Sequence, residues 1–410
     1  MQSPTAQTEI KAEIVIAGGG IAGLWLLNRL LAEGRDALLI ETQTLGSGQS
    51  VASQGMIHGG VKYALGGNLT GASEAISEMP GRWRDCIDGH GEIDLSAVRV
   101  LSDHFYLWSG AGAGSRLTSF FASRMLRGRV ETVAKAARPA VFDDPGFKGK
   151  LYKLVDLVLD APSLIQTLAD NAKGRVLKVD GDKVQWPALS EGQTLKQIQL
   201  DANTSLSAQH WVLTAGEGNE SILKSLGLQN PEMQRRPLHQ VLVKHSYPEP
   251  LYAHCLGSNP SPRLTVSSHR CRDGQWAWYL GGDLATEGIE RSEAEQIDIA
   301  KRELDACLPW IDFADAQWAT LRVDRAEPKQ SKLIKPDNAW AETSPDCPNV
   351  IVAWPTKLTL APDMADRSIS LLPKAAKASE QAPAERPENC PSRSWPAPLV
   401  AEPCWETLFS

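Results

Sequence analysis

The residues with the clearest chemical potential are three glycines, Gly18, Gly20 and Gly23, whose spacing is G-x-G-x-x-G. They follow the apolar run 14–16 and precede an apolar segment with a helical pattern. In a strand–turn–helix unit, the first glycine permits the tight turn and the second lets the backbone approach a pyrophosphate. The third lets the helix pack closely on the strand, with its positive N-terminus facing the phosphates. The spacing therefore predicts a dinucleotide site.

A carboxylate follows where such a site needs one. Residues 37–40 form a second apolar run, which predicts a strand, and Glu41 comes directly after it. An acidic residue about 20 positions beyond the glycine turn accepts hydrogen bonds from the ribose hydroxyls. The alternative is a structural turn without a ligand, because glycine-rich turns are common.

A third apolar strand is predicted at residues 210–214, and it ends in Ala215 and Gly216. Small residues at a strand end allow the backbone to approach a cofactor closely. We therefore assign this strand to the same nucleotide-binding domain, although it lies far along the chain.

The order of these elements predicts an α/β fold with an interrupted domain. A chain of 410 residues is too long for one simple core. Short alternating runs between residues 236 and 282 predict an antiparallel sheet. The predicted division is a discontinuous Rossmann-like domain from residues 12–90, 150–230 and 345–372, with an inserted substrate domain from residues 91–149 and 231–344.

The segment 373–410 has a different composition, with seven prolines among its 38 residues. Such a segment cannot bury a core by itself, so we predict a disordered tail. Its aromatic residues Trp395, Trp405 and Phe409 are interpreted as incidental, with docking on the body or on a partner as the alternative.

Composition narrows the class of protein further. The net charge of -7 argues against nucleic acid as a partner, and no apolar run approaches the length of a membrane span. The polar N-terminus predicts no signal peptide and hence a cytoplasmic protein. Seven cysteines without a C-x-x-C pair and eight histidines without an H-x-x-x-H pair predict no metal site.

Two further motifs resemble those of a known family. Residues 53–63, S-Q-G-M-I-H-G-G-V-K-Y, resemble the S-x-x-x-I-H-G-G-x-R-Y loop of glycerol-3-phosphate dehydrogenases and the I-H-x-G-x-Y-Y of L-2-hydroxyglutarate oxidases. Residues 357–366 are similar to the G-G-K-x-T-T-Y-R-x-M-A-E segment of the same dehydrogenases. Over residues 12–370 the chain thus resembles the FAD-dependent oxidoreductases grouped with D-amino-acid oxidase, glycine oxidase and glycerol-3-phosphate dehydrogenase.

The chain departs from this pattern at positions that concern the substrate. Pro355 and Thr356 replace the glycine pair, Lys62 replaces the arginine, and residues 360–362 replace Thr-Tyr-Arg. The resemblance therefore implies the flavin but not glycerol 3-phosphate itself.

The resemblance implies FAD as the cofactor, in a glutathione-reductase-like domain. The residues expected to contact it are Gly18, Gly20, Ile21, Ala22, Gly23, Glu41, Ser50, Ser53, Gln54, Gly55, Val176, Ala215, Gly216, Lys357, Leu358 and Thr359.

Three catalytic roles follow from the same motifs. Lys357 precedes a predicted helix and would stabilise the negative charge of the reduced flavin, unless it is a solvated surface lysine. His58 would orient the flavin, line the site or carry a covalent flavin link, unless it only bonds backbone in a tight loop. Lys62 lies on the same loop and would face the substrate.

Two catalytic residues are expected in the inserted sheet. His239 would accept the substrate proton, with His254 and His269 as alternatives and a satisfied structural histidine as the competing interpretation. Arg322, or its neighbour Arg325, would pair with a substrate carboxylate, unless it pairs with a nearby acid.

These observations predict an FAD-dependent dehydrogenase or oxidase that acts on a C–O or C–N bond of a small polar molecule, with 2-hydroxy acids or polyol phosphates favoured. An amino-acid or amine oxidase, a flavin monooxygenase or halogenase and a non-catalytic flavoprotein subunit remain alternatives. The electron acceptor stays open between oxygen, a quinone and a carrier protein. Because several relatives reduce membrane quinones, the cytoplasmic protein is expected either free or peripheral at the inner face of a membrane.

Overall fold

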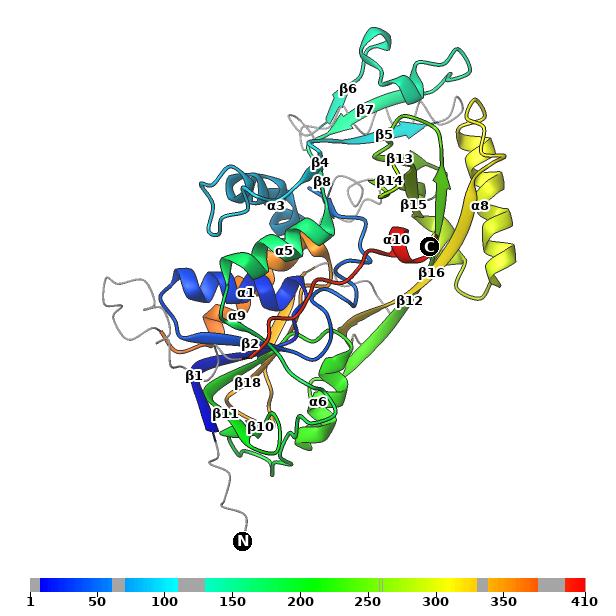
Figure 1. Cartoon of the computed structure of the whole chain (residues 1–410). Helices are drawn as coiled ribbons and strands as arrows, with labels where there is room; N and C mark the ends of the chain where they lie inside the picture. The colour runs from blue at the N-terminus through cyan, green and yellow to red at the C-terminus, as the bar shows by residue number, and fades with distance from the viewer. Residues whose placement is uncertain are drawn as a thin grey trace.

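The structure is a computed structural model of the chain (Figure 1). It describes residues 8–60, 71–109, 130–257, 259, 261–329, 338–374 and 395–409. Lys62 lies outside the described residues.

A mostly parallel sheet forms one half of the molecule, and its strand order is β17-β18-β11-β1-β2-β9, with β10 paired to β11. Its central residues 14–17, 37–40, 211–213 and 350–354 are apolar and buried because both faces are covered there. The strands are β1 (Thr8–Ala17), β2 (Ala37–Glu41), β9 (Val176–Lys178), β10 (Gln197–Gln199), β11 (Thr204–Leu213), β17 (Trp340–Thr343) and β18 (Val350–Trp354).

Helices cover both faces of this sheet. Helices α1, α3, α5 and α9 contribute to the core on one face of the sheet, and α6 contributes to the core on the other face (Figure 1). The helices are α1 (Ile21–Ala32), α3 (Gly71–Ile87), α5 (Ala161–Asn171), α6 (Gly218–Leu226) and α9 (Ala361–Leu371), with a 3-10 turn η4 (Leu358–Leu360) before α9. The sheet contains both β1 and β18, so it joins segments more than 300 residues apart.

A second, eight-stranded sheet forms the other half, in the order β16-β12-β15-β14-β13-β5-β7-β6. Its pairs are antiparallel except for β13 with β5. The strands are β5 (Phe105–Ser109), β6 (Val130–Thr132), β7 (Lys150–Leu154), β12 (Met233–His245), β13 (Ala253–Leu256), β14 (Pro262–Arg270), β15 (Trp276–Gly281) and β16 (Gln317–Pro328).

The two faces of this second sheet have different partners. On one face Val241, Val243 and Trp278 pack against α8 (Glu293–Cys307), whose capping box starts at Ser292; the short helix α7 (Asp283–Glu287) adds Leu284 to this core. On the other face Leu242, Ala277 and Tyr279 pack against Trp405 of the C-terminal helix α10 (Cys404–Thr407). Because successive strand residues point to opposite faces, residue parity decides which partner a side chain meets.

Smaller elements join the two sheets. A three-stranded sheet has the order β3-β8-β4. Its strands are β3 (Met56–Ile57), β4 (Val100–Ser102) and β8 (Leu157–Leu159), and two 3-10 turns are η2 (Lys135–Ala137) and η3 (Ala140–Phe142).

The prediction of a disordered tail is wrong for residues 395–409, which we call the C-terminal strap. The strap bonds to the first half of the molecule, where the amide of Leu45 donates to Leu399 O at 2.8 Å. It then reaches the second sheet, where Trp405 is 3% exposed and stacks on His269. Composition misled here because a few apolar side chains of the strap, such as Trp395, Val400 and Trp405, pack against cores that earlier parts of the chain form. Residues 375–394 lie outside the described part of the chain.

Within the described ranges, we find no helix that is both apolar enough and long enough to cross a bilayer.

Candidate functional site

The glycine turn lies between β1 and α1, and its glycines are required by close packing. A Cβ atom on Gly18, whose φ is +111°, would lie 2.5 Å from Ala215 Cα. A Cβ on Gly23 would overlap the carbonyl oxygen of Gly18 and lie 2.7 Å from Thr214 Oγ1. Two of the three glycines therefore bring the turn, the helix and the end of β11 into direct contact.

The N-terminus of α1 has the properties of an anion site. Its N-cap, Gly20, makes no side-chain cap, and the first turn, which includes Ala22, contains no acidic residue. Among the described residues, a Cβ on Gly20 would meet within 4 Å only Ser50 Oγ, at 3.1 Å. That hydroxyl accepts the Ile21 amide at 2.9 Å. Unneutralised helix amides beside an open glycine fit a pyrophosphate.

Glu41 is held beside this turn. One carboxylate oxygen accepts the amide of Gly19 at 2.6 Å, and the other accepts the amide of Gln43 at 2.6 Å. These two bonds leave further lone pairs on both oxygens, as ribose hydroxyls would require. The arrangement fits the ribose-binding role expected from the sequence.

The loop after β11 closes the other side of the turn. Asn219 is fully buried, and its side-chain oxygen accepts the amide of Ala215 at 2.8 Å. Trp354 donates from Nε1 to the carbonyl of Gly216 at 2.9 Å. Gly216 has a φ of +62°, which suits a glycine at this point.

The two later sequence motifs meet each other. The backbone amide of His58 donates to Thr359 Oγ1 at 3.1 Å, although 301 residues separate them. Thr359 Oγ1 in turn donates to Met56 O at 3.3 Å, and Trp83 Nε1 donates to Thr359 O at 3.0 Å. Next to His58, the amide of Gly59 donates to Asp156 at 2.8 Å. The His58 loop and the Lys357–Thr359 turn thus form one unit.

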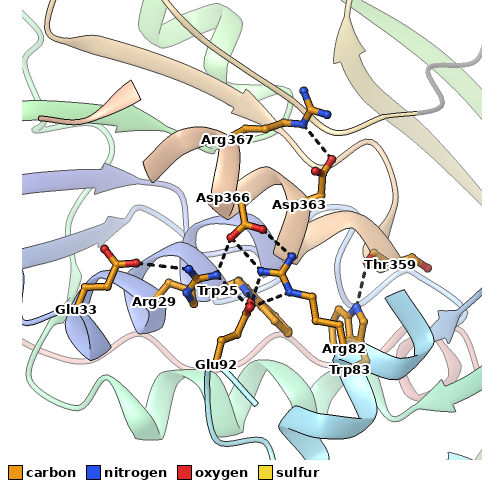
Figure 2. Close-up of polar contacts among 10 residues, drawn as sticks. All are labelled: Trp25, Arg29, Glu33, Arg82, Trp83, Glu92, Thr359, Asp363, Asp366 and Arg367. Carbon is orange, nitrogen blue, oxygen red and sulfur yellow. Dashed lines mark hydrogen bonds and ion pairs between the residues drawn. The ribbon is translucent and has the colours of Figure 1, made fainter. Parts of the chain in front are cut away.

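Figure 2 shows the ion-pair cluster that holds this turn against the domain. Asp366 of α9 accepts hydrogen bonds from Arg29 of α1 at 2.8 Å and from Arg82 of α3 at 2.6 Å, and both arginines also contact Glu92. Burial alone would raise the pKa of Asp366, but the hydrogen bonds from Arg82 and Arg29 outweigh it and hold that pKa below its usual value. Asp366, the last residue of the 357–366 motif, therefore positions α9 against α1 and α3.

Thr356 has a strained backbone. Its φ is +59°, the left-handed region that a β-branched residue rarely adopts, and it stands where the resembling family has glycine. Since the left-handed conformation costs an L-residue roughly 1–2 kcal/mol, we expect Thr356→Gly to stabilise the protein by about 1 kcal/mol. The matched substitution Thr132→Gly, at an exposed position of β6, should instead destabilise it by about 1 kcal/mol. Urea denaturation of both variants checks the prediction, and the same sign for both would contradict it.

One face of the second sheet lies against the loop that precedes His58. The hydroxyl of Tyr279 is 2.8 Å from Ala52 O and 2.8 Å from Gln240 Oε1. Gln54 Nε2 donates to the carbonyl of Tyr279 at 2.6 Å, so this predicted cofactor residue contacts the sheet. We call this side of β12, β15, β14 and β13 the loop face.

The loop face carries buried neutral polar groups at its centre. His254 Nδ1 is within hydrogen-bond distance of Thr265 Oγ1, at 2.8 Å, and its ring lies 4.5 Å from that of Phe105. Ser267 Oγ lies 3.1 Å from His269 Nε2. Burial lowers the pKa of His269 to about 3, so that imidazole is neutral at physiological pH. Of these residues, only His254 and His269 were predicted as candidates from the sequence. Thr265 and Ser267 lie four and two residues before His269 in β14, and this alternation is the signal that could have identified them.

His239 and Arg322 lie on the opposite face of the sheet. His239 Nδ1 donates to Gly288 O at 2.9 Å, and its carbonyl accepts from Gln296 of α8. Arg322 pairs with His239 across the strands and donates to Ile289 O at 2.7 Å and Arg291 O at 2.6 Å. The structure therefore does not bring these two predicted residues to the loop face. Gln240 and Leu242 of β12 point to the loop face, so the odd-numbered residue His239 between Leu238 and Gln240 points to the opposite side, and its cross-strand partner Arg322 points the same way.

The remaining predicted residues are placed as follows. Ser53 Oγ accepts the amide of Gly55 at 3.3 Å, and a Cβ on Gly55 would overlap Leu159 O. Val176 is buried beside Leu39, two residues before the end of β9. Lys357 and Leu358 lead into η4, where Lys357 is the N-cap. No group of three or more His, Cys, Asp or Glu in the described ranges is arranged to hold a metal ion.

A family comparison matches residues 13–359 of the chain to the model described as DAO, FAD dependent oxidoreductase. A probable FAD-dependent oxidoreductase of Pseudomonas aeruginosa is 51% identical over 403 residues, which are 98% of this chain and 99% of that protein. Its crystal structure superimposes on the whole of both chains with a TM-score of 0.82, at 46% identity over the structural alignment.

Two more distant solved structures have the same fold. Glycine oxidase from Geobacillus kaustophilus has a TM-score of 0.62 at 14% identity, over 87% of this chain and 95% of that one. L-alpha-glycerophosphate oxidase from Mycoplasma pneumoniae, with FAD bound, has a TM-score of 0.62 at 13% identity, over 88% and 94%. The predicted fold class, a Rossmann-like FAD domain with an inserted antiparallel sheet, is confirmed by these likenesses.

Proposed function

Because the chain belongs to the family of FAD-dependent oxidoreductases that this model describes, we propose that it oxidises a C–O or C–N bond of a small polar substrate. Within that range we favour the C–OH bond of a polyol phosphate or a 2-hydroxy acid. FAD is the cofactor, and when bound it supplies a two-electron acceptor for a hydride from the substrate. The turn at Gly18, the N-terminus of α1 and Glu41 would hold its pyrophosphate and ribose.

The observation that carries this proposal is the contact between the His58 loop and the Thr359 turn. Both segments resemble the dehydrogenase motifs, and the amide–hydroxyl bond of 3.1 Å joins them. Lys357 lies two residues before Thr359 and would place a cation at this junction, where it favours an anionic group. Lys62 belongs to the same motif and is proposed to serve a substrate phosphate or carboxylate.

The loop face would provide neutral groups that suit a hydroxyl substrate. The side chains of Gln240, Thr265 and Ser267 both donate and accept hydrogen bonds, and all are buried. Their position supports recognition of hydroxyl groups. An amino acid held by an arginine carboxylate clamp is less well supported, since the guanidinium of Arg322 bonds two backbone carbonyls on the other face.

Oxidation of an alcohol also requires a group that accepts the hydroxyl proton. We propose His254 for this role, because Thr265 fixes its Nδ1 and it lies on the loop face. His58 is proposed to orient the flavin through its place in the motif loop.

Anaerobic mixing of the FAD-loaded protein with candidate substrates tests the function. We expect polyol phosphates or 2-hydroxy acids to bleach the flavin absorbance faster than amino acids do. A protein that none of these compounds reduces, while dithionite does, would refute the substrate class. Admission of oxygen or a soluble quinone afterwards identifies the electron acceptor.

The proton acceptor is tested in the same assay. We expect His254→Gln to slow flavin reduction by about 10²–10⁴-fold with unchanged FAD content. His239→Gln should leave the rate within about twofold, since that imidazole faces α8. The reverse order of effects would assign the proton to His239.

A further inference from the structure

Two cysteine sulfurs are in contact on the α8 side of the second sheet, away from the loop face. Cys255 Sγ of β13 lies 3.6 Å from Cys307 Sγ, and 52 residues separate them in the chain. Both thiols are reduced in this structure, and both belong to the core layer between β13 and α8. A disulfide requires a sulfur separation of about 2.05 Å, so closure needs a movement of only about 1.6 Å.

The backbone at both cysteines is placed where such a movement costs little. The β13–β14 register shifts between Cys255 and Leu256, as in a β-bulge. Cys307 is the last residue of α8, beyond which Leu308 ends the helix. Bulges and terminal helix turns adjust more readily than the middle of a ladder or helix.

The two thiols differ in access and in chemical environment. Cys255 is 4% exposed, whereas Cys307 is only partly buried. The hydrogen bond with Cys307, together with burial, raises the pKa of Cys255, while the same hydrogen bond and the nearby Arg263 guanidinium lower the pKa of Cys307. Arg263 is itself positioned by Glu303 of α8, with NH2 and Oε1 3.0 Å apart. A partly exposed thiol with a lowered pKa next to a buried thiol is the arrangement of an attacking and a resolving cysteine.

We propose that Cys307 and Cys255 form a peroxide-sensitive dithiol, in which hydrogen peroxide converts the pair into a disulfide between β13 and α8. The Cys307 thiolate attacks one peroxide oxygen, the O–O bond breaks, and a sulfenic acid forms while hydroxide leaves and takes a proton as water. Cys255 then attacks the Cys307 sulfur, the S–O bond breaks, and the second water leaves with the Cys255 proton. The sulfurs lose two electrons in total, and the peroxide gains two.

Thiol mapping of the FAD-loaded protein tests this site. The reduced protein is treated with hydrogen peroxide, alkylated with N-ethylmaleimide and digested without reductant for mass spectrometry. We expect a cross-linked peptide pair containing Cys255 and Cys307, which dithiothreitol reverses. The cross-link should also raise the midpoint of thermal unfolding by about 3 °C, because it restricts the unfolded chain.

Variants separate the two steps. In Cys255→Ser, peroxide should leave a sulfenic acid on Cys307 that dimedone traps, and in Cys307→Ser neither product should form. Cys404 is the internal control, because it is also partly exposed while burial raises its pKa to about 12. Oxidation of Cys404 as fast as Cys307, or Cys307 sulfinic acid without a cross-link in the unsubstituted protein, would overturn the proposal.

Discussion

Replacement of Gly23 by alanine should abolish the retention of FAD. The added Cβ would overlap Gly18 O and approach Thr214 Oγ1 to 2.7 Å, and neither group can move without separating α1 from the strand ends. Overpacking typically costs about 1–3 kcal/mol, and a loss of about 2.7 kcal/mol in the binding free energy corresponds to a hundredfold weaker binding. The FAD-to-protein ratio after gel filtration, and titration of the apoprotein with FAD, measure the loss.

Two further glycines make this test specific. Gly20→Ala places its Cβ near Ser50 Oγ alone, so this variant should fold normally and still bind FAD more weakly. At Gly81, on the exposed side of α3, an added Cβ would meet none of the described residues within 4 Å, so Gly81→Ala should retain FAD fully. Wild-type FAD affinity in Gly23→Ala would contradict the assigned role of the turn.

Replacement of Trp405 by alanine should lower the free energy of unfolding by about 3 kcal/mol, at the lower end of the range for a buried tryptophan. The indole is 3% exposed, and its ring lies 3.8 Å from that of His269 at an angle of 16°. The indole belongs to the same buried cluster as Leu242 and Tyr279, so its removal also exposes these two side chains. Urea denaturation measures the energy, and limited proteolysis within residues 395–409 measures the release of the strap.

Leu399 provides the matched control for this prediction. It belongs to the same strap but is 78% exposed, so Leu399→Ala should change stability by less than about 0.5 kcal/mol. Equal effects of the two substitutions would show that the strap is held by its backbone bonds to Leu45 rather than by the indole.

The cofactor part of the site could be predicted from sequence because local chemistry determines it. A turn that approaches a pyrophosphate needs glycine at particular positions, and the spacing at Gly18, Gly20 and Gly23 expresses that need directly. FAD as the cofactor and the oxidoreductase class, both expected from the motif order, are confirmed by the family match over residues 13–359.

The orientation of strand β12 could not be predicted in the same way. Its residues 241–243 are all apolar because α8 buries one face and the strap buries the other, so no alternation marks the faces. His239 and Gln240 are adjacent polar residues, and a shift of one position exchanges their faces. The packing of α8 against the sheet places His239 on the face opposite the loop face, and this contact is not visible in the local sequence.

The strap escaped prediction for a related reason. Its composition is that of a disordered segment, and its stability comes from partners more than 100 residues earlier, such as His269 and Cys271. Thr356 is the converse case, since the sequence departs from glycine there while the backbone keeps the conformation that glycine favours.

The position of the strap also bears on the order in which the protein is made. Residues 395–409 follow every other described element along the chain, so a ribosome releases them after both sheets have emerged (Figure 1). Until Trp405 leaves the exit tunnel, His269 on the loop face lacks the indole that stacks on it. The nascent protein therefore passes through a stage in which both sheets are complete but the contacts that the strap makes to each of them have not yet formed.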